Sequence, residues 1–166
     1  GCFRSSSCKM SLKLFDTHTH FDVPDFEHDR EQLAYAAKKA GVEGLILIGF
    51  LQQRFQDLIQ TQHFLNNLAD APRSYLAPGL HPFYIEQHQQ DHLQDLEQIL
   101  QTEDCIAIGE IGLDTFLKQH KQAEIFQKQK DFFAAQIELA QQYDKPILLH
   151  IRKSHAEVLK ILKEHQ

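Results

Sequence analysis

The sequence contains 11 histidines among 166 residues, and histidine is the side chain that most often binds metals and moves protons. His18 and His20 are separated by one residue at the end of an apolar segment. On an extended backbone, side chains two residues apart point to the same side, so both imidazoles can bind one ion. This spacing favours a metal site, although two surface loop histidines would give the same pattern.

Glu110 and His150 each follow a short apolar segment. A buried carboxylate is costly unless it is paired. A metal ion would pair with Glu110, whose two oxygens could bridge two ions. Backbone amides or an arginine would serve a purely structural Glu110 equally well. His150 is either a metal ligand or a core histidine that hydrogen-bonds a backbone carbonyl. Oxygen and imidazole donors without thiolates suit Mg²⁺, Mn²⁺ or Zn²⁺, and such ions activate water for hydrolysis.

Three further polar residues follow the same apolar segments. Arg152 lies two residues after His150 and is expected on the same side, where a guanidinium suits phosphate binding or a structural salt bridge. His81 either contacts substrate or caps the loop before Pro82. Asp114 either orients a histidine ligand from behind or caps a short turn. We include all three among the candidate substrate-binding residues.

These residues must be positioned by five repeats of a strand followed by a helix. The expected strands are residues 12–17, 42–50, 74–80, 105–111 and 145–150. Four helices are expected at residues 25–40, 52–68, around 93–100 and 119–143. A fifth helix is expected after Ser154, which forms a capping box with Glu157. Alternating strands and helices predict a parallel sheet, in which the polar residues above gather at the carboxyl ends of the strands. No glycine-rich phosphate loop follows the first strand, which argues against a nucleotide-binding sheet.

Composition restricts the class of protein. With 42% apolar and 24% charged residues, the chain is an ordinary globular one, long enough for one core. A net charge of −6 argues against a basic nucleic-acid coat protein, and no apolar segment is long enough to span a membrane. The three cysteines form no disulfide pattern, which favours the reducing cytoplasm.

We expect residues 1–10 to be a disordered extension and residues 11–166 to form the domain. The dispersed glutamines, and the other histidines, are interpreted as solvated: His28, His63, His88, His92, His120, His155 and His165.

Four segments together resemble the signature blocks of the TatD family of metal-dependent deoxyribonucleases. They read FDTHTHFD, GLHP, GEIGLD and PILLHIR, and HIRKSH is most similar to the YjjV-like branch. The resemblance runs from about residue 12 to the end of the chain. It implies a TIM (β/α)8 barrel, of which this chain would hold the first five βα units as the N-terminal portion.

The resemblance also implies a site with two divalent ions. In that site His18 and His20 bind the first ion, Glu110 bridges both as the catalytic carboxylate, and His150 binds the second. The family's further histidine and aspartate ligands would follow later strands than this chain contains. The resemblance therefore covers four of the six ligands.

Three functions remain open at this point. The first is hydrolysis of DNA phosphodiesters by metal-activated water, with His81 and Arg152 holding phosphate. The second is hydrolysis of small-molecule esters, lactones or amides, which the acidic chain favours slightly. The third is an inactive fragment kept for interaction, which would self-associate through the sheet edge and the uncovered interior of a half-barrel.

Overall fold

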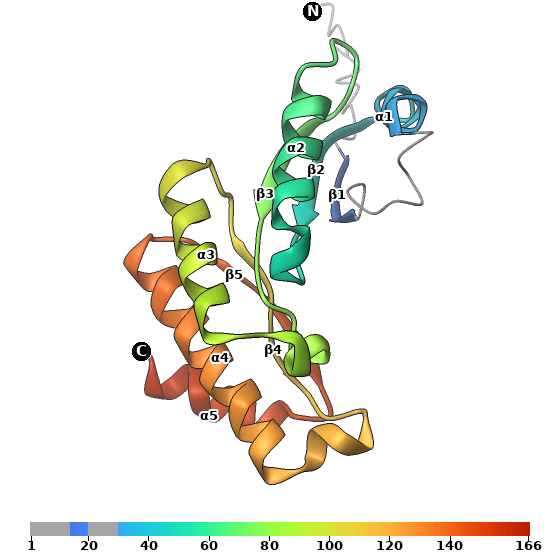
Figure 1. The fold of residues 1–166 in the computed structure, drawn as a ribbon. Helices are drawn as coiled ribbons and strands as arrows, with labels where there is room; N and C mark the ends of the chain where they lie inside the picture. The colour runs from blue at the N-terminus through green and yellow to red at the C-terminus, as the bar shows by residue number, and fades with distance from the viewer. Residues whose placement is uncertain (1–13, 20–29) are drawn as a thin grey trace, which may run out of the picture.

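A computed structural model describes residues 14–19 and 30–166, and in this part of the chain strands and helices alternate (Figure 1). The elements in order are β1 (Leu14–Thr19), α1 (Arg30–Lys39), β2 (Val42–Ile48), η2 (Gln52–Arg54), α2 (Phe55–Asn66), β3 (Arg73–Ala77), η3 (Pro82–Gln87), α3 (Gln90–Thr102), β4 (Ile108–Asp114), η4 (Lys118–Lys121), α4 (Ala123–Gln142), β5 (Ile147–Arg152) and α5 (His155–Glu164). The η elements are short 3₁₀ helices. The α/β class and the five expected strand–helix repeats are confirmed.

The strands are parallel and follow the order of the chain. One sheet has the order β1-β2-β3, and β4 pairs with β5 in a second sheet. The two sheets are joined by a parallel bridge between Leu76 and Cys105 and by a hydrogen bond of 3.3 Å from the Gly109 N–H to the Pro78 carbonyl. Because all strands run the same way, their carboxyl ends lie along one edge, as predicted.

The helices cover the strands and close the core. Leu45, Leu47 and Leu76 from the strands are fully buried, and α4 contributes Phe133 and Ile137 to the same cluster. The spacing of these α4 positions was the signal for a long helix, and the structure confirms that this face is buried. Removing a large apolar side chain of this kind from water typically stabilises a fold by about 1.5–3 kcal/mol.

Three local predictions were wrong. The segment 119–143 is not one helix, because Gln122 is extended (ψ 137°) and separates η4 from α4. The segment 52–68 likewise begins with the 3₁₀ turn η2 before α2 starts. Ser154 precedes α5 but makes no capping bond with its side chain. Its hydroxyl instead donates to the Leu113 carbonyl at 2.9 Å, because a buried hydroxyl pairs with whatever acceptor the packing offers.

The expected extension over residues 1–10 lies outside the described residues. None of the helices in the described part of the chain combines the length and the apolar character that a membrane span requires.

Candidate metal and substrate site

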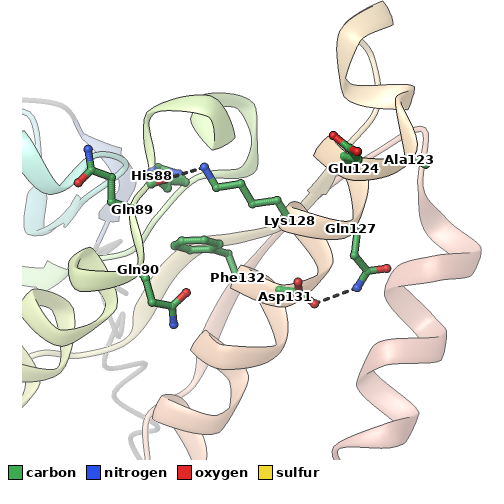
Figure 2. Close-up of a pocket in the computed structure, with 9 residues that line it drawn as sticks. All are labelled: His88, Gln89, Gln90, Ala123, Glu124, Gln127, Lys128, Asp131 and Phe132. Atoms are coloured by element: carbon green, nitrogen blue, oxygen red, sulfur yellow. Dashed lines mark hydrogen bonds between the residues drawn. The ribbon is translucent and has the colours of Figure 1, made fainter.

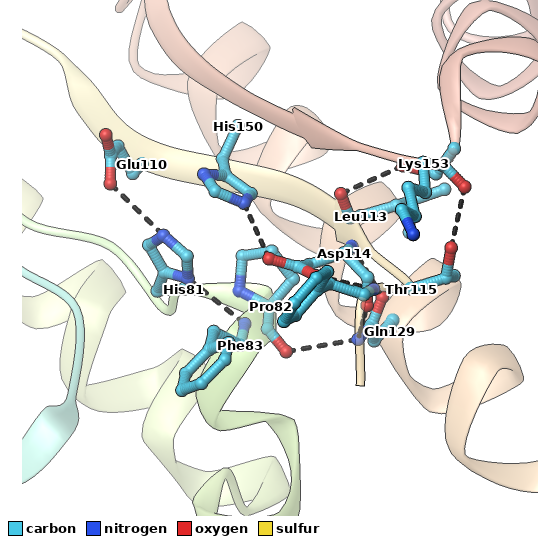
Figure 3. A network of polar contacts seen from close by, with 12 residues as sticks. His81, Pro82, Phe83, Glu110, Leu113, Asp114, Thr115, Gln129, His150 and Lys153 are labelled. Atoms are coloured by element: carbon cyan, nitrogen blue, oxygen red, sulfur yellow. Dashed lines mark hydrogen bonds and ion pairs between the residues drawn. The ribbon is translucent and has the colours of Figure 1, made fainter. Parts of the chain in front are cut away.

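Three of the candidate side chains meet across β3, β4 and β5 (Figure 3). His81 follows β3, whereas Glu110 lies inside β4 and His150 inside β5, because these two strands continue past the ends at residues 111 and 150 that the sequence predicted. The His81 Nε2 lies 3.2 Å from a carboxylate oxygen of Glu110, and the rings of His81 and His150 are 4.3 Å apart between centroids. A potential ligand atom from each of the three residues lies within 4.8 Å of the other two. The side chains are 12%, 15% and 25% exposed in the order His81, Glu110 and His150. The cluster is therefore mostly shielded from water, although each of its side chains keeps some exposed surface.

Close approach of two backbones places His81 beside Glu110. A Cβ atom on Gly79 would lie 1.6 Å from the carbonyl oxygen of Gly109, which no real side chain permits. Only glycine at position 79 lets the segment after β3 pack directly on β4. The glycine of the GLHP segment is thus the local reason that His81 can reach the carboxylate.

Asp114 holds His150 from behind. Its Oδ2 lies 2.8 Å from the His150 Nε2, and its Oδ1 accepts the Phe116 backbone N–H at 2.9 Å. The aspartate is only 1% exposed. Both alternatives considered for Asp114 are therefore present in one side chain, which orients a histidine and closes a turn. With Nε2–H donated to Asp114, the other ring nitrogen of His150 keeps a lone pair for a metal ion.

His81 has the opposite arrangement. The Phe83 backbone N–H donates to the His81 Nδ1 at 3.0 Å, so that nitrogen carries the lone pair and Nε2 carries the proton of the neutral ring. The Nε2–H then points at Glu110 as a donor. Binding a metal through Nε2 would require a proton on Nδ1, opposed to the Phe83 N–H. His81 is thus better suited to donate a hydrogen bond to an oxygen than to ligate an ion.

Two buried glutamines on α4 hold the chain segments that carry the site. The Gln129 amide accepts the Asp114 N–H at 3.0 Å and donates to the carbonyls of Asp114 (2.8 Å) and Pro82 (3.1 Å). Two turns further, the Gln136 amide accepts the Leu80 N–H at 2.8 Å and donates to the Leu80 carbonyl at 3.3 Å. Both are 1% exposed, so the prediction of solvated glutamines is wrong for them. Backbone N–H and C=O groups that are buried here and point away from a paired strand require such partners.

Arg152 lies at the end of β5 and is exposed. Its guanidinium carbon is 3.6 Å from the centroid of the Phe116 ring, and the Lys153 ammonium is 5.3 Å from the same centroid. The Thr115 hydroxyl donates to the Lys153 carbonyl at 2.6 Å and so ties this turn to the end of β4. The predicted phosphate-binding role of Arg152 stays a prediction.

The HxH pair is described only in part. His18 lies in β1, whose residue Thr19 pairs with Leu47, so the backbone of His18 lies near the same edge as the cluster. His20 lies outside the described residues, as does the side chain of His18. Their metal-binding roles stay predictions.

Two histidines that were interpreted as solvated are buried. His120 is 0% exposed and bonds Glu86 at 2.8 Å through Nε2, whereas His88 is 1% exposed and donates its Nε2–H to the His81 carbonyl at 2.7 Å. Desolvation by burial lowers the pKa of His88 to about 4. The sequence gives no sign of this burial, because the neighbours of both histidines are polar and show no apolar periodicity. The two histidines are buried because the 3₁₀ turns η3 and η4 place them against α4.

His88 also lines a groove of about 680 Å³ on the α4 side of the molecule (Figure 2). The groove contains none of the three clustered residues. Its cation, Lys128, donates to the His88 backbone carbonyl at 2.6 Å, and Gln127 donates to Asp131 at 2.9 Å. Lys128, Gln127 and Asp131 of this groove are thus already paired within the protein.

Parallel strands whose carboxyl ends carry a shielded carboxylate and oriented imidazoles are the arrangement of metal-dependent α/β hydrolases. The chain belongs to the family described as TatD related DNase, whose pattern matches residues 15–166. The family resemblance read from the four sequence segments is therefore confirmed.

Two relatives match most of this chain at moderate sequence identity. The Escherichia coli protein named uncharacterized metal-dependent hydrolase YjjV is 34% identical over 158 residues, which is 94% of this chain and 57% of that protein. A Pantoea ananatis protein named 3′-5′ ssDNA/RNA exonuclease TatD is 28% identical over 90% of this chain and 54% of its own length. The chain thus spans little more than half the length of these relatives.

Solved structures agree on the fold. The crystal structure of E. coli YjjV matches with a TM-score of 0.78 at 34% identity, over 92% of this chain and 56% of that one. A TatD family hydrolase from Entamoeba histolytica matches with a TM-score of 0.80 at 23% identity, over 94% of this chain and 55% of that one. The arrangement of strands and helices is therefore that of the family.

Proposed function

We propose that this chain carries part of the active site of a metal-dependent hydrolase that cleaves DNA phosphodiesters. The observation that supports this most directly is the shielded cluster of Glu110, His81 and His150, with Asp114 orienting His150. The exonuclease names of TatD relatives such as the Pantoea protein support a nucleic-acid substrate. The five βα units would form the first part of an eight-stranded barrel.

The residues of the cluster fit divalent ions by their donor chemistry. Glu110 offers carboxylate oxygens and His150 offers Nδ1, and the predicted ligands His18 and His20 would bring the ligands on this chain to four of the family's six. We propose two ions, of Mg²⁺, Mn²⁺ or Zn²⁺, with Glu110 shared between them as the catalytic carboxylate. When bound, such ions lower the pKa of water and stabilise the charge that develops on the phosphate.

The remaining side chains act on the substrate. The His81 Nε2–H is directed into the cluster and would donate to a phosphate oxygen instead of to Glu110 once an ion neutralises that carboxylate. Arg152 would pair with phosphate from the rim of the site. Asp114, which is buried, acts by holding His150 rather than by touching substrate.

A cleavage assay tests the proposal. The complete protein with all eight βα units is incubated with end-labelled single-stranded DNA in Mg²⁺, Mn²⁺ or Zn²⁺ and, separately, in EDTA. We expect cleavage that needs the ion and disappears in Glu110→Gln. Glu138→Gln is the matched control, because Glu138 is 69% exposed on α4. Absence of metal-stimulated cleavage in the wild type, or full activity in Glu110→Gln, would refute the proposal.

A second candidate substrate class is small-molecule esters, lactones or amides. The net charge of −6 favours uncharged or cationic substrates over a polyanion. Parallel assays of the same preparation on DNA and on a panel of aryl esters separate the two classes, because the same metal chemistry serves both. Ester turnover without DNA cleavage would assign the second class.

Self-association is a third expectation for this chain. Leu149 on β5 and Leu159 on α5 are 40% and 55% exposed, and an inactive chain kept for interaction would use such surfaces. We propose that the chain forms dimers or larger oligomers. We also propose a cytoplasmic location, because the three cysteines form no disulfide pattern. Sedimentation as a monomer at high concentration would refute the association.

A further inference from the structure

An exposed aromatic ring with two cations lies beside the cluster. Phe116 is 45% exposed, and its ring is the common neighbour of the Arg152 guanidinium and the Lys153 ammonium. Within residues 14–19 and 30–166, neither cation forms an ion pair with a carboxylate. Among the described residues, Phe116 is the one ring that has two cations over it, and this shared ring distinguishes Arg152 and Lys153 from the other basic side chains.

The backbone around the ring is fixed rather than free. The Phe116 N–H is bonded to Asp114, the same carboxylate that holds His150, so the ring is tied to the site through one group. Lys153 has a positive φ of 52°, a conformation that is costly for lysine. The Thr115 hydroxyl and backbone N–H bond the carbonyls of Lys153 and Arg152 and hold the turn in that conformation.

We propose that Phe116, Arg152 and Lys153 form a subsite for an unpaired nucleotide next to the bond that is cleaved. The ring and the guanidinium stacked on it form a flat surface for one base, and the Lys153 ammonium pairs with the adjoining phosphate. This inference rests on the proposed function, because it assigns the substrate class as single-stranded nucleic acid. Paired bases present no free face, so a duplex would not use the ring.

The chemistry separates base recognition from phosphate recognition. Stacking needs the ring and a base, so Phe116→Leu should weaken binding of a normal strand at least about fivefold and leave an abasic strand unaffected. The lysine needs only the phosphate. Lys153→Asn, which keeps a residue that tolerates positive φ, should weaken both strands and reduce the salt slope of binding by about 0.7.

The experiment measures fluorescence anisotropy of a labelled ten-nucleotide oligothymidylate and of its abasic counterpart, in EDTA so that no cleavage occurs. The matched control is a second arginine–aromatic pair of the described residues, Arg73 and Tyr75. Their guanidinium lies 6.0 Å from the ring at the start of β3, away from the site. Arg73→Ala and Tyr75→Leu should bind both strands as the wild type does. Thermal melting of each variant confirms that it is folded.

The outcomes separate this inference from the proposed function. Equal weakening of both strands by Phe116→Leu, or no weakening, overturns the base platform even if the DNA cleavage assay succeeds. Wild-type protein that binds no strand up to about 100 µM, the weak end of non-specific binding, also overturns it. Base-dependent binding together with a failed cleavage assay supports the subsite and refutes the hydrolysis of DNA.

Discussion

Gln129 gives the sharpest test of how the site is supported. Replacing it by leucine keeps the approximate volume but removes three hydrogen bonds, two to the backbone of Asp114 and one to that of Pro82. The residue is 1% exposed, so water cannot replace the lost partners. A buried donor without a partner costs about 1–3 kcal/mol, and each lost bond about 1 kcal/mol. Allowing for the apolar gain of leucine, we expect Gln129→Leu to lower the free energy of unfolding by about 2–4 kcal/mol.

Urea unfolding followed by circular dichroism measures this loss, and a loss of 3 kcal/mol corresponds to a Tm lower by roughly 6–12 °C for a chain of this size. Gln127→Leu is the matched control, since Gln127 is exposed on the same helix and its amide bonds the exposed Asp131. The control should change stability by less than about 0.5 kcal/mol. If Gln129→Leu and Gln127→Leu differ by less than about 1 kcal/mol, the backbone of Asp114 does not depend on this amide.

The remaining predictions concern the strands and the buried imidazole. Gly112→Ala should destabilise the fold strongly, or prevent folding, because φ is +148° and the added Cβ would lie 2.1 Å from the His150 carbonyl oxygen; an unchanged urea midpoint would contradict this. The pKa of His88 is lowered from 6.5 to about 4 in the folded chain. As pH falls from 6.5 to 4, the imidazole is therefore protonated in the unfolded chain before it is protonated in the folded one. The free energy of unfolding falls over this window by at most about 1.4 kcal/mol per pH unit. Urea midpoints across that window should fall less steeply with pH in His88→Gln than in wild type. The exposed control His155→Gln should leave this slope unchanged. Identical slopes in all three proteins would contradict a lowered pKa of His88. Ser154→Ala should lower the free energy of unfolding by about 1–3 kcal/mol, because its buried hydroxyl is the partner of a carbonyl in β4, and a change below about 0.5 kcal/mol in the same assay would argue against that bond.

The sequence by itself predicted the repeating strands and helices and the edge at which the site lies. Apolar segments followed by polar residues carry that information, since parallel strands bring the residues near their carboxyl ends to the same side of the sheet. The exact strand ends were not predicted, because β4 and β5 continue through Glu110 and His150. His81, Glu110 and His150 were all found in this way, and the structure brings them together. The family was recognised from the same segments because they are the ones in which chemistry restricts residue type.

The tertiary structure decided what each polar side chain does. The two roles of Asp114 and the donor state of His81 depend on backbone N–H groups that no spacing rule places. Gln129 and His88 look like surface residues in the sequence, yet packing encloses both, because a buried polar side chain is defined by partners far away in the chain. Local sequence restricts local conformation, whereas hydrogen-bond partners, burial and pKa are set by contacts between distant segments, and only the folded chain determines these.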